Sequence, residues 1–129
     1  MCAIVVTTIY FSAALALRHS YALRVPPGEI LRLTHPFERF EIVGLAYIAK
    51  APMLDGLADS PDDPARSPVM LYEDNHPLGP AHSVHADIAE SGDGQFSHWK
   101  SVGFIFSSSD GTDPNVNGRN YWVVPSSRP

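Results

Sequence analysis

The sequence has little cysteine and little positive charge. Its 129 residues include one cysteine, Cys2, which cannot form an internal disulfide bond or a site with several thiolate ligands. Nine lysines and arginines stand against fourteen acidic residues, and the formal charge is -5 with no basic cluster. Because nucleic-acid binding needs a basic surface that neutralises phosphates, the composition argues against nucleic acid as a partner.

Recognised catalytic motifs are missing as well. The two serines that lie near histidines in the sequence, Ser83 and Ser97, are not part of a Gly-x-Ser-x-Gly nucleophile elbow. The sequence also has no glycine-rich loop of the phosphate-binding type. The acidic pair Glu73-Asp74 is expected to be a solvated turn. We therefore predict no catalytic residues.

The first part of the chain is its longest uncharged stretch. The sixteen residues from Cys2 to Leu17 carry no charge. As a helix they would rise about 24 Å, against a hydrocarbon core of about 30 Å. With Arg18 extending to the interface, we expect residues 1–24 to be a single-pass membrane anchor. A cleaved signal peptide and a buried strand or helix are the alternatives. A short anchor before a Pro/Gly-rich β domain favours an extracytoplasmic position for the remainder.

Residues 25–129 are expected to fold as one β-rich globular domain. Twelve prolines and nine glycines argue against long helices. Proline and aspartate together predict a solvated loop at 51–68. β-Branched and aromatic runs predict strands at 41–49, 69–73, 83–88, 96–99, 102–107 and 120–124. Short strands between turns predict a mainly β fold, a small antiparallel β-sandwich or barrel-like domain, preceded by one N-terminal transmembrane helix.

Histidines and carboxylates offer candidate metal ligands. If residues 83–88 form a strand, His85 and Asp87 share one face while His82 lies on the other. Together with the later His98 they could bind zinc, whose usual ligands include imidazole and carboxylate. The spacing matches no strong metal motif, so structural roles for these histidines are the leading interpretation.

The segment 107–119 is rich in side-chain oxygens. Asp110 and Asp113 are candidate calcium ligands, but the acid that closes an EF-hand loop is missing. The leading interpretation is a rigid turn in which Arg119 bridges to one or both aspartates. Two further residues are expected to supply the positive φ angles of this turn, Asn117 and Gly118. We predict no cofactor, with calcium or zinc as the alternatives.

Aromatic residues could form a ligand platform. If they are exposed, their rings could stack on the sugars of a glycan, although aromatics at strand spacing are more often core residues. The four candidates are Tyr72, Trp99, Tyr121 and Trp122.

The second half of the chain carries three distinctive stretches, LYEDNHPLGPAH at 71–82, FSHW at 96–99 and SDGTDPNVNGRNY at 109–121. They resemble an uncharacterised β-rich module of bacterial proteins that is sometimes found beside envelope or glycan-modifying enzymes. The resemblance implies a β-rich fold, and it transfers no catalytic residue to this chain.

The leading functional hypothesis is a non-catalytic, membrane-anchored interaction domain that serves as an accessory subunit of a larger membrane or envelope protein complex. Its expected partners are the membrane and other protein subunits. The second hypothesis is a glycan-binding module of the cell envelope. The third is a metal-dependent enzyme.

Overall fold

The described part of the protein is mainly β, as the sequence predicts. The computed structural model describes residues 30–41 and 43–125. Its strands are β1 (Leu31–Arg32), β2 (Glu38–Arg39), β3 (Tyr47–Ala49), β4 (Val69–Glu73), β5 (His76–Pro77), β6 (Phe96–Trp99), β7 (Gly103–Phe106) and β8 (Tyr121–Pro125). Two helical segments accompany them, the 3-10 helix η1 (Pro52–Leu57) and α2 (His85–Ser91).

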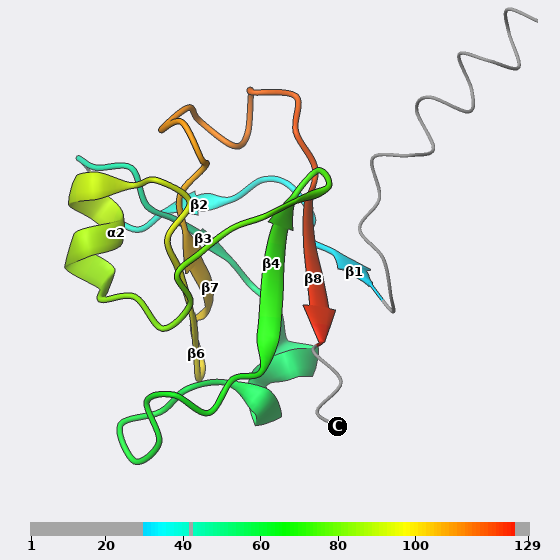
Figure 1. Ribbon diagram of the computed structural model, residues 1–129, viewed down its shortest axis with the longest axis vertical. Coiled ribbons are helices and arrows are strands. Elements are labelled where there is room, and N and C mark those ends of the chain that lie inside the picture. The colour runs from blue at the N-terminus through cyan, green and yellow to red at the C-terminus, as the bar shows by residue number, and fades with distance from the viewer. Residues whose placement is uncertain (1–29, 42, 126–129) are drawn as a thin grey trace, which may run out of the picture.

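The strands form two antiparallel sheets. One has the order β1-β8-β4-β5 and the other β2-β3-β7-β6. The longest pairing joins β4 to β8, with Val69 opposite Pro125 and Glu73 opposite Tyr121. Figure 1 shows three layers from left to right: α2, the sheet that contains β7, and the sheet that contains β4 and β8.

Alternation along the strands builds the core. In β7, Phe104 and Phe106 belong to the main core between the sheets, and Ile105 belongs to a second cluster with Ile88 of α2. Successive side chains of a strand point to opposite faces, so β7 contributes to both clusters. All four residues of β7 are buried, because a layer covers each of its faces.

The segment 83–88 is a prediction that the structure corrects. It was expected to be a strand, but α2 begins at His85 and ends at Ser91. Val84, Ala86 and Ile88 alternate with polar residues, which is typical of a strand. In α2 a different set of residues faces the sheet: Ile88 and Ala89 are buried, while Val84 and Ala86 are exposed, so tertiary packing overrides the local pattern.

The strand expected at 41–49 is formed only at Tyr47–Ala49. The N–H of Leu45 donates to the carbonyl of Ala89 at 2.9 Å, which ties this part of the chain to α2. That backbone group is therefore not available to a neighbouring strand. The strands at 69–73 and 96–99 are found at the expected positions, and those at 102–107 and 120–124 shift by one residue at their ends.

The segment 51–68 is more structured than a solvated loop. It contains η1, and within it Asp59 is fully buried. The N–H of Asp59 donates to the carbonyl of His98, and the N–H of Lys100 donates to the carbonyl of Asp59. These bonds attach the segment to the end of β6.

The expected membrane anchor, residues 1–24, lies outside the described residues. Among the residues that are described, no helix has both the length and the apolar character needed to span a bilayer.

Candidate functional site

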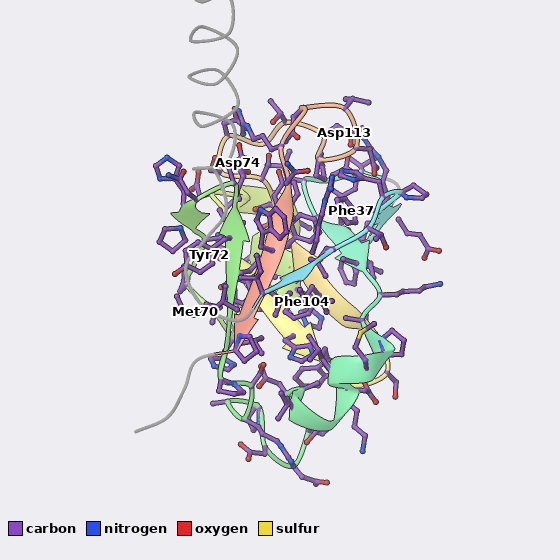
Figure 2. The ribbon with its side chains drawn as sticks, turned by 90° about the vertical axis from the view of Figure 1, so that its right-hand side faces the viewer. Phe37, Met70, Tyr72, Asp74, Phe104 and Asp113 are labelled. Carbon is purple, nitrogen blue, oxygen red and sulfur yellow. The ribbon has the colours of Figure 1, made fainter. Side chains whose placement is uncertain are left out.

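The outer face of the β1-β8-β4-β5 sheet is apolar and aromatic. Val69, Leu71 and Glu73 of β4 are buried, whereas Met70 is 37% exposed and Tyr72 is half-buried. Figure 2 shows Met70 and Tyr72 along the left of β4, with Phe37 and Phe104 on its other side. The pleat therefore divides β4 into an inner and an outer set of side chains.

The neighbouring strand continues the same surface. Trp122 of β8 lies directly opposite Tyr72, and Val124 lies opposite Met70. Directly opposed side chains of an antiparallel pair lie close enough to interact. Within the described residues, no helix or strand packs over this face (Figure 1). We call these four residues, Met70, Tyr72, Trp122 and Val124, the outer aromatic face.

A cation borders the outer aromatic face. Arg32 of β1 is paired with Trp122, and its guanidinium carbon lies 5.8 Å from the centre of the indole ring. The Nη2 group of Arg32 also donates to Asn120 Oδ1 at 2.6 Å. The guanidinium is thus held beside the ring, at a distance suited to a cation–π interaction.

The four aromatics predicted as a platform do not share one surface. Tyr72 and Trp122 come together on the outer aromatic face. Tyr121 has no exposed surface, because the alternation of β8 turns it into the core, and its hydroxyl donates to Glu73 Oε2 at 2.9 Å. Trp99 lies on β6 in the other sheet. The spacing of β4 and β8 could have added Met70 to the platform, since it shares a face with Tyr72.

The four candidate zinc ligands do not form a cluster. His82 Nδ1 is 2.6 Å from Asp59 Oδ2, and His85 Nε2 is 3.3 Å from Ser97 Oγ. Asp87 lies on the exposed side of α2. Within the described residues, no three His, Cys, Asp or Glu side chains converge as metal ligands would.

His98 is also engaged elsewhere, inside the core. Its Nδ1 is 2.6 Å from Ser67 Oγ, and its ring stacks on Phe104 with 4.3 Å between centroids. Only 2% of His98 is exposed.

The candidate calcium ligands bind protein groups. Both carboxylate oxygens of Asp110 accept hydrogen bonds from Arg119, at 2.9 and 2.8 Å. Asp113 Oδ1 accepts from the N–H of Asn115 at 2.8 Å. Arg119 therefore ties Asp110 but not Asp113. Its guanidinium beside Asp110 holds the pKa of that carboxyl well below the usual range.

The turn residues differ in their roles from those expected. Gly118 has a positive φ of 75°, but Asn117 does not have a positive φ. The side chain of Asn117 instead makes contacts: its Nδ2 donates to Tyr121 Oη at 3.0 Å, and its Oδ1 accepts from the N–H of Arg119.

Glu73 is the residue whose environment differs most clearly from the prediction made from the sequence. It was expected to be solvated, yet it is 5% exposed. Its carboxylate accepts hydrogen bonds from Tyr121 Oη, from Arg119 Nη1, and from the N–H and hydroxyl of Ser109. The alternation of β4 places Glu73 on the inner face with Leu71, which could have indicated its burial. Burial raises the pKa of Tyr121, and the adjacent carboxylate acts in the same direction.

The buried imidazole of His98 should make the stability of the protein depend on pH. Burial lowers the pKa of His98 from 6.5, partly offset by Asp59 and Asp55. Between the folded and unfolded pKa values the unfolded chain binds more protons, so stability is lost as pH falls below about 6.5. We expect the urea midpoint to fall between pH 8 and pH 5. His98→Phe, which keeps a ring beside Phe104, should reduce this fall. An equal fall in the variant would contradict the assignment.

A small two-sheet antiparallel β domain with one exposed aromatic face is the class of structure that these features define. Comparison with protein-family models, with curated proteins and with solved structures found no match to this chain.

Proposed function

We propose that this protein is a non-catalytic interaction domain, and that the outer aromatic face is its surface for a protein partner. In the proposal, residues 1–24 hold the domain at a membrane, on the extracytoplasmic side, as an accessory subunit of a larger complex. The observation that carries the proposal is the composition of the outer aromatic face. A fully solvated sheet face would be polar, whereas this one presents Met70, Tyr72 and Trp122.

The residue types on this face are those of protein interfaces. Tyrosine, tryptophan, methionine and arginine are enriched at the centres of interfaces, while lysine and glutamate are depleted. Tryptophan, tyrosine and arginine also contribute the largest binding energies. Tyr72, Trp122 and Arg32 lie together at one place on the sheet. No lysine or carboxylate lies among the outer-facing residues of β4 and β8.

Loss of the two ring side chains should release the partner. The test extracts the tagged full-length chain in a mild detergent and measures the size of the particle that contains it. Tyr72→Ser with Trp122→Ser should weaken association at least about 30-fold, which corresponds to about 2 kcal/mol. The expected result is a large particle for the wild-type chain and a small one for the double variant.

Two controls make this measurement specific. Trp99→Ser removes an aromatic residue from the other sheet and should leave the large particle intact. The urea midpoint of the double variant must stay near that of the wild type, because both changed side chains are partly exposed. Particles of equal size for the wild type and the double variant would contradict the proposal.

A glycan is the second candidate for this face. The direct pairing of Tyr72 with Trp122 favours it, since two adjacent rings offer a flat apolar surface. Binding of an oligosaccharide that is lost in the same double variant, without any protein partner, would select this alternative.

A further inference from the structure

A separate cavity lies between the start of α2 and the end of β6. It has a volume of about 370 Å³, near the lower end of the range for small-ligand sites. Its walls come from segments far apart in the sequence, and include Asp59, Pro64, His82, Val84, His85 and Trp99. We call it the His82 pocket. The strand that lines it is β6, whereas the outer aromatic face is formed by β4 and β8 of the other sheet. The pocket is therefore separate from the proposed protein interface.

A buried carboxylate fixes the orientation of His82. Asp59 Oδ2 lies 2.6 Å from His82 Nδ1, and Asp59 Oδ1 accepts the N–H of Ser67 at 2.7 Å. The carboxylate has no exposed surface, while 32% of the His82 side chain is exposed. A carboxylate beside Nδ1 keeps a proton on that nitrogen. The other ring nitrogen, Nε2, is therefore left for an external group.

The backbone at His82 also indicates a constrained site. His82 has a φ of 56°, which lies in the left-handed region that only a small fraction of non-glycine residues adopt. Its neighbour Ser83 is held as well, with its hydroxyl donating to the carbonyl of Pro80 at 2.7 Å.

A second imidazole, that of His85, also lines the pocket. His85 Nε2 lies 3.3 Å from the hydroxyl of Ser97, and its ring meets Trp99 edge-on at 5.6 Å. Burial lowers the pKa of His85, so it is the neutral imidazole that contacts Ser97 near neutral pH. The lining of the pocket thus combines apolar surface with hydrogen-bonding groups.

The composition of the lining narrows the class of ligand. It contains no lysine or arginine, so it lacks the charge partners that a phosphate or carboxylate would need. Both oxygens of its one carboxylate already have partners within the protein, which leaves no ready site for a cation. The groups that remain for a ligand to contact are the imidazole and hydroxyl groups of the lining and the apolar side chains of Trp99, Pro64 and Val84.

We propose that the His82 pocket binds one uncharged pyranose residue of a glycan. A pyranose combines hydroxyl groups, which suit His82 Nε2 and the neighbouring polar groups, with apolar C–H edges, which suit Trp99 and Val84. A hydroxyl of the bound sugar forms a hydrogen bond with Nε2 of His82. The pocket size matches a single ring rather than a long chain.

The two tryptophans of the chain allow a direct test, because one lies in each site. The full-length chain, labelled with nitrogen-15 in a detergent without a sugar headgroup, is titrated with a panel of methyl α- and β-pyranosides. The panel covers glucose, galactose, mannose and N-acetylglucosamine. We expect at least one of them to shift the indole N–H resonance of Trp99 saturably and leave that of Trp122 in place. Single Trp→Phe variants assign the two resonances.

The variant for this test is His82→Asn, because asparagine tolerates a positive φ. It should weaken the sugar titration at least tenfold and leave the dispersion of the remaining resonances unchanged. Trp122→Phe is the matched control and should bind as the wild type does. The proposal is overturned if no pyranoside shifts Trp99, if His82→Asn binds equally well, or if inorganic phosphate displaces the sugar. A shift of Trp122 alone would instead place the sugar on the outer aromatic face.

Discussion

Gly103→Ala is expected to destabilise the fold more than the same change at any other glycine that the structure describes. Gly103 begins β7 with a φ of 109°, which side chains rarely accept. A Cβ atom there would overlap the carbonyl oxygen of Ala49 and lie 3.1 Å from the Cα atom of Lys50. Both are backbone atoms at the end of β3, which pairs with β7 in the core sheet.

The expected cost has two parts. The backbone conformation contributes roughly 1–3 kcal/mol, and the overlap with a backbone that cannot rotate away contributes roughly 1–3 kcal/mol more. Because the whole fold is stable by about 5–15 kcal/mol, the sum is a large fraction of the total. Urea denaturation followed by tryptophan fluorescence measures it.

Two other glycines separate these causes. Gly118 also has a positive φ, of 75°, but an added Cβ atom would meet nothing within 4 Å. Gly118→Ala should therefore show the conformational part alone. Gly56, in η1, has open space and no positive φ, so Gly56→Ala should have little effect. A midpoint for Gly103→Ala equal to that of Gly118→Ala would show that the overlap is relieved at no cost.

Arg119→Ala is expected to give the second largest loss of stability. Arg119 Nη1 lies 3.2 Å from Glu73 Oε1, and the side chain of Glu73 is only 7% exposed. Removing one partner of a fully buried ion pair costs about 3–5 kcal/mol. Glu73 keeps its bonds from Ser109 and Tyr121, and 30% of Arg119 is exposed, so we expect about 2–3 kcal/mol.

An exposed ion pair provides the control. Lys50 Nζ lies 3.2 Å from Glu38 Oε1, with both side chains more than half exposed. Lys50→Ala should change the free energy of unfolding by about 0–1 kcal/mol. Equal, small losses from Arg119→Ala and Lys50→Ala would show that Glu73 does not depend on Arg119. Added calcium should shift neither midpoint if segment 107–119 is a structural turn.

The local sequence predicted a strand correctly where its residue pattern fitted a strand and no other element. Residues 69–73 are a run of four apolar and aromatic side chains and one glutamate before an Asp-Asn turn, and β4, its turn and β5 are formed there. The strands expected at 96–99 and 102–107 leave only Lys100 and Ser101 between them, and β6 and β7 pair there as a hairpin. The apolar residues of segment 83–88 have the two-residue period of a strand, but in α2 Ile88 is buried, while Val84 and Ala86 are exposed. Packing against Ile105 selected the helix.

The candidate sites were predictable in part. The sequence placed Tyr72 and Trp122 among four candidate platform residues, and His82 and His85 among four candidate metal ligands. It did not indicate Asp59, which is twenty-three residues from His82 and in a stretch that reads as solvated. Burial of that carboxylate depends on the end of β6, and no local pattern reports such a contact.

By itself the sequence determined that the domain is mainly β and which residue types are available for binding. Those properties follow from composition and from the two-residue period of strands, which are local. The tertiary structure decided which polar groups are buried, Glu73 and Asp59 above all, and which aromatics face outward. Burial and pairing depend on contacts between distant segments. A charged side chain in a turn-like stretch is therefore solvated or buried according to what packs over it.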